Sequence, residues 1–223
     1  VDQDLVDALT AGSAEEQRDY FLSRQQYSLR EFWDAFYTPY DEGESEAGET
    51  YDWFLGYPKM REALLEHASH ARNGAGTVLI LGCGNSELSE RMYDDGWTQQ
   101  INIDFSKPVI DLMRSKHTDK PGMEWAVMDA RDMSGVPDGS VQTVIDKGLI
   151  DALTHSDQYR DDIQKVVAES ARVLRPGGSY ICTSFNTPES LLPLLSNNAW
   201  QSEGVECRGN LTPTVLLYVG YKR

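Results

Sequence analysis

The chain has 223 residues, of which 40% are hydrophobic, and its formal charge at pH 7 is −16. This length is enough for one domain with a buried core, and no apolar run reaches the roughly 18 residues that a membrane span needs. The strong negative charge argues against tight nucleic-acid binding and is compatible with a basic protein partner. The three cysteines form no CxxC pair and the four histidines no metal-binding motif, so we expect a cytoplasmic chain without structural disulfides or metal. We also expect it to be a monomer.

Residues 1–57 are expected to form an N-terminal lid segment, and residues 58–223 the main body of a single domain. Residues 1–37 have a helical pattern with an aromatic face. Residues 41–49, DEGESEAGE, are an acidic loop that we expect to be mobile. The first 17 residues lack the pattern of a signal peptide, although the chain does not begin with Met and a trimmed leader stays open.

From residue 77 onward, apolar strands alternate with amphipathic helices. The expected strands are 77–84, 101–106, 123–130, 141–148, 179–185 and 212–222, and the expected helices between them are 86–95, 107–117 and 161–174. This alternation predicts an α/β fold with a doubly wound, mostly parallel sheet. Ligands of such sheets bind outside the carboxyl ends of the strands, where the strand order reverses.

The first of these strands runs into a glycine-rich turn, LGCGNSEL, that ends in a helix. Gly82 and Gly84 permit positive φ or the close approach of a ligand to the backbone; a tight turn without a ligand is the alternative. A dinucleotide-binding loop would carry a third glycine where this chain has Glu87, and no phosphate-binding loop follows. The turn therefore favours a nucleoside ligand without phosphates.

Acidic residues end the next two strands. Asp104 lies 22 residues after Gly82 and is placed to accept hydrogen bonds from both hydroxyls of a ribose. Asp129 is placed to accept from the exocyclic amine of adenine, and the small Ala130 leaves room for the ring. Each carboxylate alone is equally compatible with a loop cap, but their order along the chain favours one nucleoside site.

The segments LGCGNSELS, NIDFS, VMDA and VIDKGLIDAL, with FWDAFY and YDWF upstream, resemble a known family. They are similar to the class I, seven-stranded methyltransferases that bind S-adenosylmethionine. More narrowly, they resemble the eukaryotic methyltransferase-like group, which includes lysine methyltransferases acting on translation elongation factor one alpha. The similarity covers about residues 27–185 and implies a Rossmann-like, seven-stranded sheet with helices on both faces.

The resemblance also implies a set of cofactor contacts. They are Gly82 at the methionine end, Gly84 as a further cofactor-binding residue, Asp104 and Phe105 at the ribose, Asp129 and Ala130 at the adenine, Lys147 lining the cleft, and Trp33, Tyr37 and Trp53 folded over the cofactor. Aromatic faces suit this role because they attract a sulfonium cation without acting as nucleophiles. Leu149 departs from the group, which usually has Thr at that position, and puts this contact in doubt.

Methyl transfer from a sulfonium is an in-line displacement, so it needs positioning and desolvation but no covalent nucleophile. An acceptor lysine must arrive neutral, and Asp146, Asp151 or Tyr37 is a candidate to guide its proton loss, with helix capping an equal alternative for the two aspartates. No (N/D)PP(Y/F) segment follows the fourth strand, which disfavours methylation of planar nitrogens. A small-molecule methyltransferase and a non-enzymatic cofactor-binding module remain alternatives, whereas Glu87 disfavours an NAD-dependent oxidoreductase.

Overall fold

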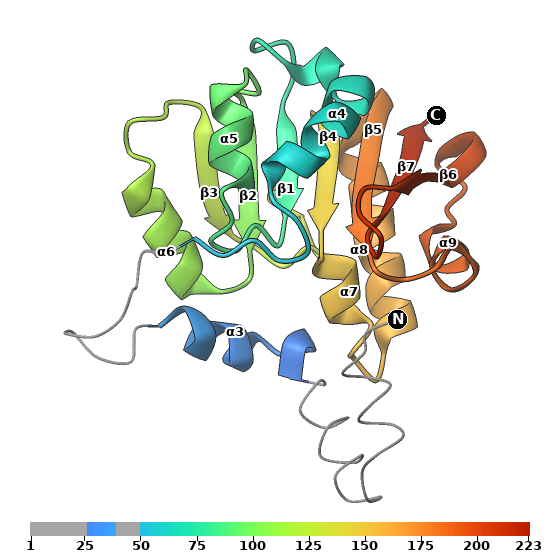
Figure 1. Ribbon diagram of the computed structural model, residues 1–223, viewed down its shortest axis with the longest axis horizontal. Coiled ribbons are helices and arrows are strands. Elements are labelled where there is room, and N and C mark those ends of the chain that lie inside the picture. Colours follow the sequence, from blue (N-terminus) through green and yellow to red (C-terminus); the bar gives the residue numbers. More distant parts are fainter. Residues whose placement is uncertain (1–25, 39–49) are drawn as a thin grey trace, which may run out of the picture.

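A seven-stranded sheet runs through the computed structural model, which describes residues 26–38 and 50–223 (Figure 1). The order across the sheet is β3-β2-β1-β4-β5-β7-β6. The strands are β1 (Val78–Leu81), β2 (Gln100–Asp104), β3 (Met123–Val127), β4 (Val141–Lys147), β5 (Leu174–Ser184), β6 (Trp200–Asn210) and β7 (Leu216–Lys222). The helices are η1 (Gln26–Ser28), α3 (Arg30–Tyr37), α4 (Tyr57–His67), η2 (Ser69–Ala71), α5 (Leu88–Asp94), α6 (Lys107–Lys116), α7 (Leu149–Leu153), α8 (Tyr159–Val173) and α9 (Pro188–Leu195).

The sheet is mostly parallel, as predicted. β1 pairs in parallel with both β2 and β4, and only the contacts of β7 with β5 and β6 are antiparallel. The chain leaves β1 toward β2 and β3 on one side and returns to β4 on the other, so the strand order reverses between β1 and β4. The carboxyl ends of these two strands therefore flank a crevice of the kind that binds ligands in doubly wound sheets.

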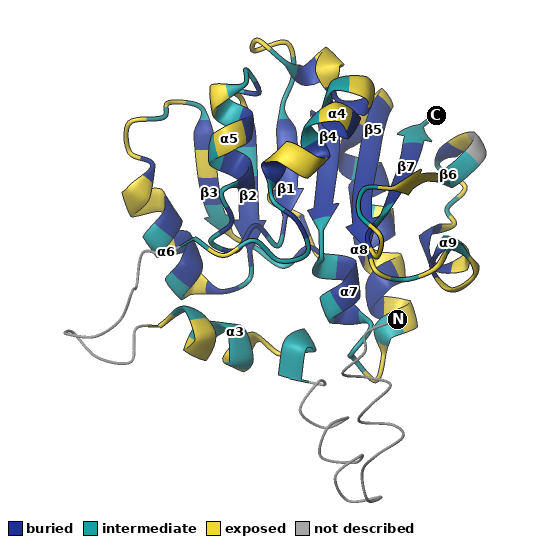
Figure 2. Ribbon diagram, viewed as in Figure 1, coloured by how far each residue is buried: buried dark blue, intermediate teal, exposed yellow. Residues whose placement is uncertain are grey.

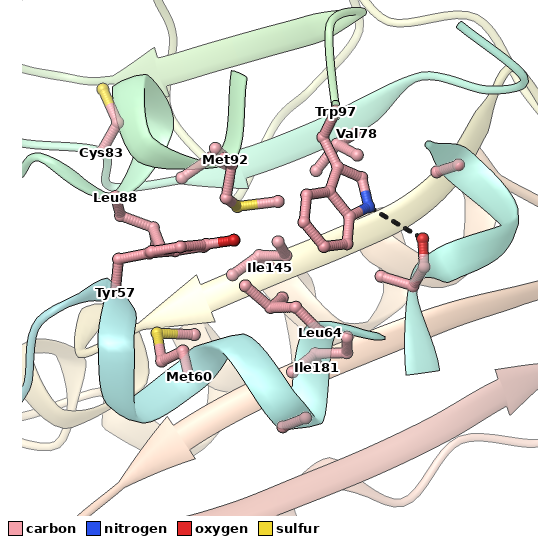
Figure 3. Packing of buried hydrophobic residues seen from close by; sticks show 14 of the residues in the cluster. Tyr57, Met60, Leu64, Val78, Cys83, Leu88, Met92, Trp97, Ile145 and Ile181 are labelled. Atoms are coloured by element: carbon pink, nitrogen blue, oxygen red, sulfur yellow. Dashed lines mark hydrogen bonds between the residues drawn. The ribbon is translucent and has the colours of Figure 1, made fainter. Parts of the chain in front are cut away.

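Helices cover both faces of the sheet, and each face has its own apolar core (Figures 1 and 2). Successive residues of β1 alternate between the two: Val78 and Ile80 pack with α4, α5 and α6, whereas Leu79 and Leu81 pack with α7 and α8. All four side chains are therefore buried, as is typical of a central parallel strand. In the first core, the Trp97 indole donates a 2.8 Å hydrogen bond to the Ala68 carbonyl (Figure 3).

The described N-terminal segment, residues 26–38, lies across the carboxyl ends of the strands (Figure 1) and is less buried than the body. None of the residues of α3 is fully buried, and in Figure 2 this helix is partly or fully exposed along its length. The expected helix over residues 1–37 is observed as η1 and α3, and its first 25 residues, together with the acidic loop 41–49, lie outside the described residues. Within the described part of the chain, no helix is long and apolar enough to cross a membrane.

Four elements differ from the sequence-based expectation. β6 had no predicted counterpart, because its alternation is interrupted at Gly204 and Gly209, which both have positive φ, and its register with β7 shifts twice. The short α7 and α9 were likewise not predicted. The segment RPGG, expected as a break after α8, is instead the beginning of β5.

Candidate functional site

A cavity of about 920 Å³ lies at the carboxyl ends of the strands, beneath α3 and residues 51–54. Its size is within the roughly 300–1,000 Å³ of pockets that bury a small organic ligand. Eleven of the residues expected at the site line it: Trp33, Tyr37, Trp53, Gly82, Gly84, Asp104, Phe105, Asp129, Ala130, Lys147 and Asp151. Asp146, expected beside them, lies behind the wall.

The glycine loop admits two close neighbours from other elements. Gly82 and Gly84 have φ of +53° and +51°, a left-handed conformation that other residues rarely adopt. A Cβ at Gly84 would lie 2.7 Å from the Tyr37 hydroxyl, and one at Gly82 would lie 3.3 Å from the Cβ of Leu149. The glycines thus let α3 close on the loop, and Leu149, the residue that departs from the family pattern, packs against the first of them.

Asp104 is fixed at the end of β2 by backbone groups on two sides. Its Oδ2 accepts a hydrogen bond from the Gly84 N–H at 3.0 Å, and its Oδ1 accepts from the Ser106 N–H at 2.9 Å. Burial raises the pKa of Asp104 to about 6, although these hydrogen bonds act in the opposite direction. Each carboxylate oxygen keeps a second lone pair, so the group can still accept hydrogen bonds from a ligand.

Asp129 at the adjacent strand end has a fixed cationic partner. Arg131 binds it through a fork, with Nε 3.0 Å from Oδ1 and a terminal nitrogen 2.7 Å from Oδ2. Although burial raises the pKa of Asp129, these hydrogen bonds and the Arg131 charge lower it below its ordinary value. The guanidinium also lies 3.3 Å from Asp162. Asp129 therefore stays ionised, and only its remaining lone pairs can accept from a ligand.

The segment expected to form a lid contributes a wall of aromatic rings. Trp33 stacks on Tyr37 with ring centroids 5.7 Å apart and meets Trp53 edge to face at 5.8 Å, and Tyr27 and Tyr51 pack against Trp53. The Trp53 indole N–H is buried and has no hydrogen-bond partner among the described residues. A buried donor without a partner costs free energy, so this group is available to an acceptor on a bound ligand.

Residues 50–53 are held against the body by a strap that sequence reasoning missed. Asp52 accepts hydrogen bonds from the Lys147 Nζ, at 3.0 Å, and from the Ser86 hydroxyl. Lys147 also donates to the Trp53 carbonyl at 3.2 Å, and its side chain is almost fully buried. Burial lowers the pKa of Lys147, opposed by the Asp52 charge. Lys147 thus lines the cavity as expected, and its ammonium donates to Asp52 and to the Trp53 carbonyl.

The two aspartates considered for proton transfer have different surroundings. Asp146 is completely buried, and its Oδ1 accepts from the N–H groups of Leu149 and Ile150 at the start of α7. Asp151 lines the cavity, and its Oδ1 accepts from the Phe185 N–H at 3.0 Å and the Asn186 side-chain amide at 3.1 Å. The first arrangement is the helix cap that the sequence left open as an alternative, so Asp146 has no route to a substrate in the cavity.

Comparison with known proteins assigns this arrangement to a family. Residues 79–182, from β1 to β5, match the family model described as a methyltransferase domain. The chain contains a methyltransferase domain. The glycine loop, Asp104, Asp129 and Lys147 lie within the matched residues, whereas the aromatic wall of the lid lies N-terminal to them.

Two relatives of this chain are named as methyltransferases of eEF1A lysine. The chain is 32% identical over 165 residues to the eEF1A lysine and N-terminal methyltransferase of Bos taurus, covering 73% of this chain and 22% of that protein. It is 31% identical over 170 residues to EEF1A lysine methyltransferase 4 of Bos taurus, covering 73% and 63%. It therefore spans about a fifth of the length of the first relative.

Solved structures show the same fold. The N-methyltransferase NodS of Bradyrhizobium japonicum, in complex with S-adenosyl-L-homocysteine, superposes with a TM-score of 0.54 at 14% identity, over 74% of this chain and 88% of that one. The Rossmann-like, mostly parallel sheet of the methyltransferase domain is thus the predicted one.

Proposed function

We propose that the chain is an S-adenosylmethionine-dependent methyltransferase that modifies a lysine of a protein. The observation that carries this proposal is the cavity itself, which joins a glycine loop and the strand-end carboxylate of Asp104 to an aromatic wall within a methyltransferase domain. The names of its relatives support lysine of the elongation factor eEF1A as the acceptor.

The residues of the cavity fit this cofactor. The unpartnered Trp53 indole N–H suits a ligand carboxylate or other acceptor, and the rings of Trp33 and Tyr37 suit a sulfonium. Asp104 would accept the ribose hydroxyls beside Phe105, and Asp129 with Ala130 would border the adenine. The binding of Asp129 by Arg131 leaves it fewer free lone pairs than a lone carboxylate would have.

The chain's own residues would position the reactants and exclude water. When bound, the cofactor supplies an electrophilic methyl group. The aromatic wall and Leu149 keep solvent away from this end of the cavity, which favours the neutral form of an entering lysine because burial disfavours the ammonium. Of the two aspartates, Asp151 alone borders the cavity, and the entering lysine loses its proton to solvent. The charge of −16 supports a basic protein partner and argues against nucleic acid. The chain is proposed to act as a monomer in the cytoplasm.

The test is methyl transfer from radiolabelled S-adenosylmethionine to purified eEF1A whose lysines are replaced one at a time. We expect label on the protein that one lysine replacement abolishes, with a rate that rises with pH through the neutral range and falls with added salt, since charge steers the encounter. Calorimetry should show binding of S-adenosylhomocysteine and none of NAD. Label on small metabolites alone would establish the small-molecule alternative, and comparable NAD binding would contradict the cofactor assignment.

A further inference from the structure

A second aromatic pair borders the cavity on the side away from Asp104 and Asp129. Phe54 of the lid meets Phe185, just after β5, with ring centroids 4.1 Å apart. Both side chains line the cavity, and Phe185 is 48% exposed. The ends of β2 and β3 carry the candidate nucleoside contacts. The aromatic pair instead lies at the ends of β4 and β5, on the other side of the point where the strand order reverses. The Phe185 ring therefore borders the cavity and is also exposed to solvent.

The local backbone is arranged to bring Phe54 to this position. Phe54 has φ of +71°, which few residues other than glycine adopt, and Gly148 has φ of +89°. A Cβ at Gly148 would lie 2.8 Å from Cε2 of the Phe54 ring. Such backbone strain persists where surrounding contacts impose it, and it concentrates at functional sites. Gly148 of the DKGLIDA segment thus provides the space that the Phe54 ring occupies.

Asp151 fixes the backbone that carries the second ring, Phe185. Its Oδ1 holds the backbone N–H of Phe185 and the side-chain amide of Asn186, and the residue is 9% exposed. Asn186 donates in addition to the Ser184 hydroxyl at 3.2 Å, and its carbonyl accepts from the Tyr218 hydroxyl. The turn that presents Phe185 is therefore rigidly tied, although the ring that it carries is half exposed.

We propose that Phe54 and Phe185 form the wall of the subsite for the acceptor's alkylammonium side chain, and that Asp151 is a positioning residue that sets Phe185. This inference rests on the proposed function, whose acceptor it places at this end of the cavity. The ring faces cover the methylene groups of a lysine and attract its cationic form. A half-exposed phenylalanine held by a nearly buried carboxylate is explained by this role, and not by core packing.

The binding test uses n-butylamine, which has the side chain of lysine, with S-adenosylhomocysteine present. Saturation-transfer NMR should detect amine binding to the wild type and lose most of the signal in Phe185→Ala. The matched control is Val127→Ala, at a half-exposed apolar residue of β3 that does not line the cavity; it should bind the amine as the wild type does. Equal signals from wild type and Phe185→Ala would overturn the subsite, whether or not the protein methylates eEF1A.

The kinetic test separates positioning from proton transfer. In Phe185→Ala the KM for eEF1A should rise about tenfold, the loss of about 1.4 kcal/mol of binding, with kcat and the affinity for S-adenosylhomocysteine little changed. Asp151→Asn retains an acceptor oxygen for the Phe185 N–H, so it should keep kcat, KM and the pH profile close to wild type, whereas Asp151→Ala should raise KM. Loss of kcat in a folded Asp151→Asn, with KM unchanged, would assign Asp151 to the proton and overturn its positioning role. Loss of methylation in the wild type itself would contradict only the proposed function.

Discussion

Asp104 is oriented by backbone hydrogen bonds and is also buried at the end of β2. Two backbone N–H groups fix its orientation, and burial nevertheless raises its pKa to about 6. A group with this pKa is ionised at neutral pH and becomes protonated under mildly acidic conditions. Because the protonated form loses acceptor capacity, the ribose contact proposed for Asp104 should weaken as the pH falls through this range.

We predict that the affinity for S-adenosylhomocysteine is constant above pH 7 and falls as the pH drops through 6. The decrease should approach about tenfold per pH unit below the pKa if the ionised form alone binds. Titration calorimetry from pH 5 to pH 8 would measure it, and S-adenosylhomocysteine is the suitable probe because it carries no sulfonium charge.

Asp104→Asn is the control for this dependence, since it keeps the side-chain shape without the titration. Asp104→Ala should weaken binding by a few kcal/mol at pH 7.5, because a hydrogen bond to a charged acceptor contributes about 1.5–3 kcal/mol. If Asp104→Ala binds as tightly as wild type with an unchanged circular dichroism spectrum, the ribose is bound elsewhere.

At the scale of elements, the segment expected to form a lid is tied to the body through the buried ammonium of Lys147. Residues 50–53 are joined to the glycine loop and to β4 through Asp52, Ser86 and Lys147, and α3 has no fully buried residue of its own. Removing Lys147 would leave the partly buried Asp52 carboxylate with the Ser86 hydroxyl but without its cation, at a cost of about 1–3 kcal/mol.

We predict that Lys147→Met loosens the lid while preserving the sheet. Amide hydrogen exchange over residues 28–38 and 50–57 should be faster than in the wild type, and the affinity for S-adenosylhomocysteine should fall about threefold to thirtyfold. Lys107→Met, which breaks the exposed pair with Asp111 on α6, is the control and should change neither. If exchange over these residues is already slow without ligand and insensitive to Lys147→Met, the aromatic residues belong to the core and form no lid.

The strands of the parallel half were predictable because each carries closely spaced apolar residues and is followed by a turn or helix signal. β6 was not, since its side chains are mixed and glycines with positive φ break its alternation. The same contrast holds at the site. Asp104 and Asp129 end predicted strands, whereas Asp52 is a loop carboxylate whose partners lie 34 and 95 residues away in sequence. Phe54 and Phe185 likewise carry no local signal, because tertiary packing alone brings them together.

At the scale of the whole molecule, the stability of the fold is coupled to a carboxylate that the cavity does not use. Burial raises the pKa of Asp146 to about 7. Its ionised form is therefore disfavoured in the folded protein, which binds more protons at this site than the unfolded chain between about pH 4 and pH 7. The contribution of Asp146 to the free energy of unfolding consequently falls as the pH rises through this window.

We predict that Asp146→Asn is more stable than wild type at pH 8, by a few kcal/mol at most, and that the difference shrinks toward pH 5. The asparagine oxygen can still accept from Leu149 and Ile150 at the start of α7. His67 and His70, whose pKa values burial lowers, work in the opposite direction but are common to both proteins and cancel. Thermal or urea unfolding of both proteins across this pH range measures the difference, and a pH-independent difference would contradict the shifted pKa.

The aromatic wall has an optical consequence. Of the five tryptophans in the chain, Trp97, Trp125 and Trp200 are buried in the cores on the two faces of the sheet, and Trp33 and Trp53 line the cavity. The three core indoles have fixed surroundings in the folded protein, so a change in tryptophan emission on ligand addition arises from the two in the lid. The chain thus carries its own fluorophores in the segment predicted above to close over the ligand, and a stopped-flow instrument can test for that motion in real time without an attached dye.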